Sequence, residues 1–152
     1  SNKEIDVLIE FQEGFFKHEI IRENIEFNSL IPELSVSNIE TSKKIYKNLG
    51  FKIVYERPEN KFCFIQLENN QIMIEENNNN WNVGKMEYPY GNGINISMSV
   101  NNVENLYEQL KAKDIKFFID FNMNEYRVDN KLFQDKEFLL QDPDGYLLRF
   151  NN

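Results

Sequence analysis

Apolar and polar residues follow a pattern that occurs twice along the chain. Val36-Ser37-Asn38-Ile39-Glu40 matches Val100-Asn101-Asn102-Val103-Glu104, and the same offset places 51–54 over 115–118. Further on, Ile65-Gln66 lies over Leu140-Gln141 at a larger offset, so the extra residues fall in the polar stretch from Asp120 to Lys136. An internal repeat of this kind indicates two structural units of the same design.

Each half of the repeat predicts one helix and four strands. Alternating residues predict a first strand at 29–37 and at 95–100, and apolar residues at helical spacing predict a helix after each strand. Ser37 and Asn101 each stand three residues before a glutamate, which is the capping-box spacing or a near variant of it. The other strands are predicted at 52–56, 61–67, 71–75, 116–120, 137–141 and 146–151.

The predicted fold class is therefore α+β, with two tandem βαβββ modules. One helix covers only one face of each curved mixed sheet, so the two modules leave a cleft in which a ligand would bind. We place the first module at 27–76, the connecting loop at 77–93 and the second module at 94–152. Residues 27–152 are expected to form one structural domain.

The segment 1–26 has no counterpart in either half. Its apolar residues, with charged neighbours, predict an N-terminal helical extension that is interrupted near Gly14. Packing on the sheet, extending a dimer interface and capping the cleft are all compatible with this pattern.

Composition and charge narrow the range of partners. Hydrophobic residues make up 41% of the chain, which is enough for a packed core, and the net charge of −8 repels the phosphates of nucleic acid and attracts cations. No apolar stretch has membrane-spanning length and no signal-peptide pattern is present, so we expect a cytoplasmic protein without a membrane partner. The single cysteine, Cys63, predicts a buried and inert thiol.

Three stretches, IPELSVSN at 31–38, IYKNLGF at 45–51 and QDPDGYLLRF at 141–150, together carry a family resemblance. They resemble the glyoxalase/bleomycin-resistance/dioxygenase (vicinal oxygen chelate) superfamily, and within it the bleomycin-resistance-like branch. The resemblance covers roughly 27–152. It implies paired βαβββ modules, a homodimer and a cleft on the open sheet faces. It does not imply one activity, because lyases, dioxygenases, thiol transferases and passive binders share this scaffold.

Enzymes of this superfamily bind a divalent metal through side chains on the first and last strand of each module. The resemblance places these positions at Ile31, Asn95, Ile74 and Arg149. Isoleucine and arginine do not ligate a divalent cation, and one asparagine is a poor site. The prediction is therefore no metal, no cofactor and no catalytic residue. An ion pair between Glu33 and Arg149 is expected where the metal would have been, although Glu33 facing the cleft is the other possibility.

The predicted function is a metal-independent small-molecule binding protein that sequesters a bleomycin-type cationic glycopeptide antibiotic. Aromatic residues of the connecting loop would either stack on flat rings of the ligand or fasten the loop, and Arg127 would hold a carboxylate or a loop carbonyl. The candidate ligand-binding residues are Glu33, Phe64, Trp81, Tyr88, Tyr90, Asn95, Tyr126, Arg127 and Arg149. Two alternatives stay open: a metal-dependent glyoxalase- or dioxygenase-type enzyme of the same superfamily, and a non-catalytic interaction module.

Overall fold

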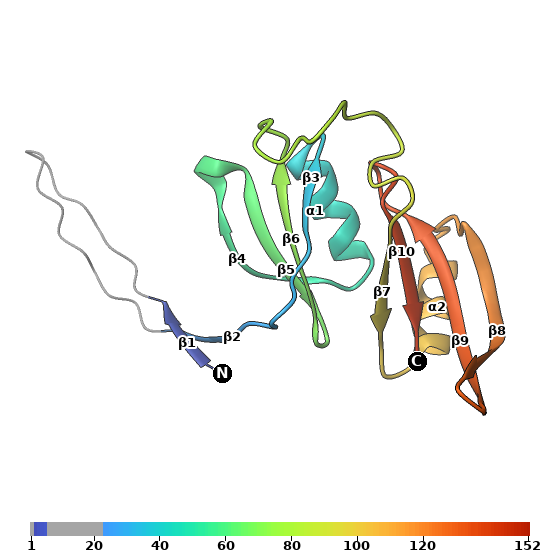
Figure 1. Cartoon of the computed structure of the whole chain (residues 1–152). Coiled ribbons are helices and arrows are strands. Elements are labelled where there is room, and N and C mark those ends of the chain that lie inside the picture. The colour runs from blue at the N-terminus through green and yellow to red at the C-terminus, as the bar shows by residue number, and fades with distance from the viewer. Residues whose placement is uncertain (1, 6–22) are drawn as a thin grey trace, which may run out of the picture. The chain divides into compact units, whose positions relative to one another are not determined.

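The computed structural model describes residues 2–5 and 23–152, and the chain divides into two units, Ser1–Pro32 and Glu33–Asn152 (Figure 1). In the first unit, β1 (Asn2–Ile5) pairs antiparallel with β2 (Glu23–Glu26). The helical prediction is wrong for these residues. The exposed Asn24 and Glu26 flank the buried Ile25, which is the alternation of a strand. The rest of the expected helical extension, including Gly14, lies outside the described residues.

The second unit contains the two predicted modules. The sheet of the first module has the strand order β3-β6-β5-β4, and the sheet of the second has the matching order β7-β10-β9-β8 (Figure 1). The elements of the first module are β3 (Glu33–Val36), α1 (Ile39–Asn48), β4 (Lys52–Arg57), the short 3-10 helix η1 (Pro58–Asn60), β5 (Phe62–Leu67) and β6 (Asn70–Glu76). Those of the second are β7 (Asn95–Ser99), α2 (Val103–Ala112), β8 (Ile119–Val128), β9 (Lys131–Gln141) and β10 (Leu147–Asn151).

The predicted α+β fold with two βαβββ modules is confirmed, and differences in the bounds have local causes. Strand β3 begins at Glu33 rather than at residue 29, because Pro32 has no backbone N–H with which to continue a ladder. The side chains that cap the helices are those of Asn38 and Asn102, one residue later than expected. Asn38 accepts a hydrogen bond from the Thr41 amide at 2.9 Å. Gly50 ends α1 with a positive φ of 104°, as its position predicts.

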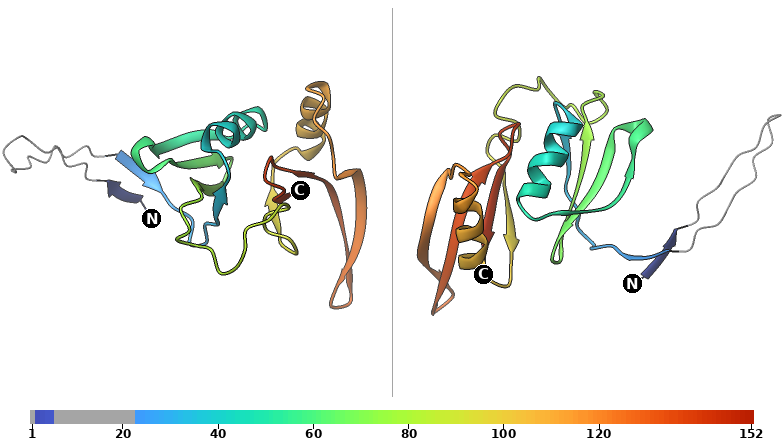
Figure 2. Two further views of the ribbon diagram at one scale, coloured as in Figure 1. Left: turned by 90° about the horizontal axis from the view of Figure 1, so that it is seen from above. Right: turned by 180° about the vertical axis from the view of Figure 1, so that it is seen from behind.

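Each helix covers one face of its own sheet (Figure 2). Strand alternation sends side chains such as Ile74 and Phe150 toward the helices, where they join one core cluster that draws on both modules. Cys63 lies in this core, and burial raises the pKa of its thiol to about 11, in agreement with the expected inert cysteine. Neither of the two α-helices in the described residues is long and apolar enough to span a membrane.

Contacts between the modules repeat the internal symmetry of the sequence. The Ser37 amide donates to Asp144 at 3.0 Å, and the equivalent Asn101 amide donates to Glu68 at 2.9 Å. Tyr146 donates to the Ser35 carbonyl at 2.8 Å. In the same way, Asn70 donates to the Ser99 carbonyl at 2.8 Å. Each module therefore uses the loop before its last strand to hold the first strand of the other.

One further contact between the modules is buried. Tyr46 of α1 donates to Asp142 Oδ2 at 2.8 Å, and Asp142 Oδ1 accepts from the amides of Asp144 and Tyr146 at 2.9 Å each. Asp142 is only 4% exposed. Burial raises the pKa of its carboxyl to about 6, although the three hydrogen bonds lower it.

The polar stretch from Asp120 to Lys136, which holds the extra residues of the second module, forms a long hairpin. Strands β8 and β9 continue to a turn at Asp129, which has a positive φ of 53°. The predicted strand at 116–120 is thus displaced and lengthened to Ile119–Val128. Several apolar side chains of the hairpin are exposed: Met123, Tyr126, Val128, Leu132 and Phe133.

We expect the Asp142→Asn variant to gain stability relative to the wild type as the pH rises. A folded pKa of about 6, above the ordinary 3.8, means that the neutral acid stabilises the fold at low pH and that this contribution is lost through pH 6. The amide stays neutral throughout. Between about pH 4 and about pH 7.5, the variant's free energy of unfolding should rise by about 2 kcal/mol relative to the wild type. Urea unfolding at both pH values measures this.

The exposed Asp114→Asn variant is the control for this pH dependence, and its difference from the wild type should stay nearly constant. An Asp142→Asn difference that is equally flat would contradict the assigned burial effect.

Candidate functional site

The face of the second sheet that is not covered by α2 carries a group of polar side chains. On β10, Leu148 and Phe150 enter the core, so Arg149 between them points to the opposite face. On β9, Asp135 and Glu137 reach this same face. Asn151 lies opposite Glu137 in the antiparallel ladder, which puts Glu137 diagonally next to Arg149, within reach of its long side chain.

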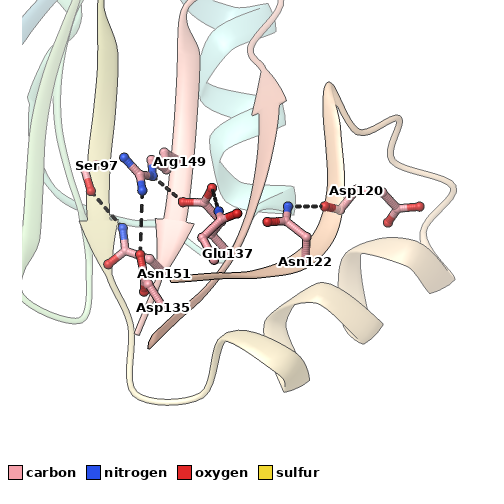
Figure 3. Close-up of polar contacts among 8 residues, drawn as sticks. Ser97, Asp120, Asn122, Asp135, Glu137, Arg149 and Asn151 are labelled. Carbon is pink, nitrogen blue, oxygen red and sulfur yellow. Dashed lines mark hydrogen bonds and ion pairs between the residues drawn. The ribbon is translucent and has the colours of Figure 1, made fainter. Parts of the chain in front are cut away.

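The side chains of Arg149, Asp135 and Glu137 form a connected cluster (Figure 3). The Arg149 Nε atom donates to Glu137, and Arg149 Nη2 lies 3.6 Å from Asp135 Oδ2. The second oxygen of Glu137 accepts a hydrogen bond from Asn124 Nδ2 at 2.5 Å. We refer to Asp135, Glu137, Arg149 and Asn124 as the Arg149 cluster.

Burial and charge decide what the Arg149 cluster can do. Asp135 and Glu137 are 8% and 6% exposed, whereas the Arg149 side chain is one third exposed. Two carboxylates share one guanidinium, so the cluster carries a formal charge of −1. Carboxylates removed from water interact strongly with nearby charge, so the net negative charge of the cluster favours a positively charged group at this face.

The expected metal positions do not all lie where the resemblance placed them. Asn95 begins β7 on the same face as Arg149, but Ile31 precedes β3 and lies outside the sheet. Ile74 is wrong as a cleft residue, because its side chain is fully buried in the core on the helix-covered face. The counterpart of Arg149 is Met73, since Glu33–Met73 and Ser97–Arg149 are matching register pairs. A slip of one residue in a strand exchanges the two faces.

The donors at these corrected positions do not fit a divalent metal. Arg149 places a permanent cation there, and Ser97 already accepts a hydrogen bond from Asn151 at 2.8 Å (Figure 3). Met73 offers only a soft thioether, so Glu33, the counterpart of Ser97, is the one carboxylate among the four positions. Within residues 2–5 and 23–152, no group of three or more His, Cys, Asp or Glu side chains lies close enough together to hold a metal ion.

The expected ion pair between Glu33 and Arg149 is wrong. Glu33 is exposed at the start of β3 in the first sheet, while Arg149 pairs with Glu137 and Asp135 of its own sheet. The neighbouring strand β9 supplies both partners; it begins at Lys131, before the strand predicted at 137–141, so Asp135 was not expected in the sheet. Asp135 and Glu137 alternate along the chain directly before the core residue Phe138. This pattern could have indicated that both side chains lie on the face opposite the core.

The uncovered face of the first sheet is aromatic instead of charged. Phe64 is buried there and stacks on Tyr55 with ring centroids 5.2 Å apart. The Arg57 guanidinium lies 3.9 Å from the centre of the Phe62 ring. Phe64 therefore belongs to a packed aromatic group, and its side chain presents almost no surface.

The aromatic residues of the connecting loop lie in two different environments: Tyr90 packs against the turn before β10, and Trp81 lies beside the first module. The Tyr90 amide donates to the Asp144 carbonyl at 2.8 Å, and the Tyr90 ring makes an edge contact with Tyr146. Gly145, with a φ of 95°, lets Pro89 approach so closely that an added Cβ would lie 2.6 Å from the Pro89 Cβ. The side chain of Tyr88 is mostly exposed. Trp81, by contrast, lines a hollow in the first module.

Tyr126 and Arg127 stay within the β8–β9 hairpin. The Tyr126 ring stacks on Phe133 with centroids 6.0 Å apart, and Arg127 Nη1 donates to the carbonyl of Asp129 at 3.1 Å. Arg127 thus holds a loop carbonyl, one of the two roles expected for it. Of the predicted site residues, the structure places Arg149 and Asn95 on one face, and it adds Asp135, Glu137 and Asn124.

Comparisons with known proteins agree with this architecture. The sequence model of the family described as "Glyoxalase/Bleomycin resistance protein/Dioxygenase superfamily" matches residues 28–150. A comparison with curated proteins finds no match. The solved structures that share the fold at low sequence identity include the following three.

The first is a glyoxalase/bleomycin resistance protein/dioxygenase from Alicyclobacillus acidocaldarius, with 19% identity over 82% of this chain and 89% of that one and a TM-score of 0.59. The second is a bleomycin-binding protein complexed with bleomycin, with 17% identity, 83% and 98% coverage and a TM-score of 0.58. The third is a bleomycin resistance determinant encoded on the transposon Tn5, with 18% identity, 83% and 98% coverage and a TM-score of 0.59.

Replacing Arg149 should destabilise the fold. The Arg149→Met variant leaves two nearly buried carboxylates without their cation, which should lower the free energy of unfolding by about 3 kcal/mol. Urea unfolding at neutral pH measures the change. The matched control is Arg127→Met, because this arginine is exposed and should cost less than about 0.5 kcal/mol. Equal stability of the two variants would show that the cluster does not depend on Arg149.

Proposed function

We propose that this chain, which belongs to the Glyoxalase/Bleomycin resistance protein/Dioxygenase superfamily, is a metal-independent binding protein for a small organic cation. The observation that carries the proposal is the Arg149 cluster. An arginine stands at a position where enzymes of the superfamily would need a metal ligand, and two nearly buried carboxylates surround it. This arrangement disfavours a metal cation and leaves a net negative charge for an organic one.

Binding would use the cluster as follows. Arg149 holds Glu137 and Asp135 in place, so the carboxylate oxygens need little rearrangement when a ligand arrives. An ammonium or amidinium group of the ligand donates to these oxygens in charge-assisted hydrogen bonds. Ile119, which is exposed and lies opposite the buried Leu139 beside the cluster, offers apolar contact to the body of the ligand. The face therefore suits a molecule with a cationic group attached to an apolar or flat portion.

Bleomycin is the first ligand to test. The similar structures include a bleomycin-binding protein in complex with bleomycin and a bleomycin resistance determinant. As a cationic glycopeptide, bleomycin carries the charge that the proposed site would attract. The net charge of −8 also favours the approach of a cation from solution. Sequestration, in which the protein binds the antibiotic without altering it, requires no catalytic group.

We expect calorimetric titration with metal-free and with copper-loaded bleomycin to give binding near one ligand per chain. Glu137→Gln removes one charge of the cluster while keeping a side chain that can accept from Asn124. It should weaken binding about tenfold, the equivalent of one charge-assisted hydrogen bond of about 1.4 kcal/mol. The control variant Glu108→Gln changes the net charge equally at an exposed position of α2 and should bind as the wild type does.

No detectable heat with either form of bleomycin, at two temperatures, would refute bleomycin as the ligand. A divalent metal that remains bound in a one-to-one ratio and supports turnover of a carbonyl or thiol substrate would favour the enzyme alternative.

The homodimer implied by the resemblance stays a prediction. The exposed apolar side chains of the β8–β9 hairpin, such as those of Leu132 and Phe133, form the surface that we expect a second copy to cover.

A further inference from the structure

A polar hollow of about 590 Å³ lies in the first module, where the β4–β5 connection meets the beginning of the connecting loop. It shares no residue with the Arg149 cluster, and its volume falls within the range of small-molecule sites, about 300–1,000 Å³. We call it the Trp81 hollow. Its lining includes Arg57, Glu59, Glu75, Asn78, Asn80 and Trp81.

The asparagine run that forms one wall is held by its own side chains. Asn77 Oδ1 accepts from the Asn79 amide, and Asn78 Oδ1 accepts from the Asn80 amide, each at 3.0 Å. Asn78 Nδ2 also donates to Glu75 at the end of β6. Successive turns of this type fix a loop without a helix or a sheet ladder. The wall is thus built in advance of any ligand.

Trp81 presents an apolar surface to this polar hollow. Its side chain is 60% exposed, and no ring stacking or cation contact occupies the indole among the residues that the structure describes. An exposed indole leaves a large apolar area in water, which binding of a ligand would remove.

The charged groups around the hollow are of both signs, and two of them already form an ion pair. Lys61 donates to Glu76 at 2.7 Å, and Arg57 lies over the Phe62 ring. The lining therefore matches neither a simple anion nor a simple cation. It offers carboxylate and amide oxygens as acceptors next to guanidinium and amide nitrogens as donors.

A sugar ring has the complementary chemistry. Each hydroxyl group both donates and accepts a hydrogen bond, and the C–H groups on one side of a pyranose form an apolar face. We propose that the Trp81 hollow is a carbohydrate-binding site in which a pyranose ring stacks on Trp81. Its hydroxyl groups are held by Glu59 and Arg57 on one side and by Asn80 on the other. This site is independent of the function proposed for the Arg149 cluster.

Trp81 is the only tryptophan in the chain, so the tryptophan fluorescence of the intact protein, excited at a wavelength at which tyrosine does not absorb, reports on this hollow alone. The probes are the methyl glycosides of glucose, mannose, galactose and N-acetylglucosamine, with glycerol as a polyol that lacks a ring. We expect at least one glycoside to change the tryptophan emission with saturation. Asn80→Ala should weaken that glycoside at least about fivefold, whereas Glu108→Gln should leave it unchanged.

Saturation-transfer NMR on the glycoside gives a second readout that does not need the fluorophore. The Trp81→Ala variant, which loses an exposed side chain and should keep the wild-type unfolding midpoint, should lose the transfer signal. The proposal is overturned if no glycoside exceeds glycerol in the fluorescence titration, or if the transfer signal persists in folded Trp81→Ala.

Discussion

Each helix of this chain covers one face of a four-stranded sheet, so strand alternation sends every second side chain to a face that the helix leaves uncovered. On β10 that side chain is Arg149, between the core residues Leu148 and Phe150. On β9 it is Glu137, next to the core residue Phe138. The same packing rule that fills the core therefore determines which residues meet on the open face. The polar character of that face follows from the sequence at alternate positions.

The two modules are held in register by a reciprocal set of contacts. Each last loop reaches the first strand of the other module, through Asp144 and Ser37 on one side and through Glu68 and Asn101 on the other. Tyr46 and Asp142 add a buried hydrogen bond. The donors to the Asp142 carboxylate are uncharged, and they do not fully offset the cost of removing it from water. The loop that contains Asp142 thus combines a buried link between the modules with a titratable group, which connects stability to pH.

The sequence predicts the architecture well, because repetition and periodicity are local signals. The two βαβββ modules, the Gly50 helix end and the buried Cys63 could all be identified from residue types at known spacings. The errors arise where a shift of one residue in the alignment of the two modules moves a side chain to the other face of the sheet. Counting placed Ile74 in the cleft, but an inserted residue in the loop before the last strand of the second module makes Met73 the counterpart of Arg149.

Side-chain pairing was less accessible to sequence reasoning. An unpaired charge in an apolar cleft is costly, which made Glu33 the predicted partner of Arg149. The observed partners, Asp135 and Glu137, lie on β9, and only the ladder between β9 and β10 brings them to Arg149. The helical reading of the N-terminal segment failed at its described ends for a related reason. Short strands such as β1 and β2 depend on a pairing partner rather than on a long periodic pattern.

The central claim is that a cationic ligand binds at the Arg149 cluster, and its location can be measured directly. Amide and arginine Nε resonances of the isotope-labelled protein would be followed by NMR while metal-free bleomycin is added. The account predicts that the largest shifts map to Asp135, Glu137 and the Arg149 side chain, with smaller ones on neighbouring residues of β9 and β10. Saturating shifts that are confined to the first module, or the absence of any shift at these residues, would contradict it.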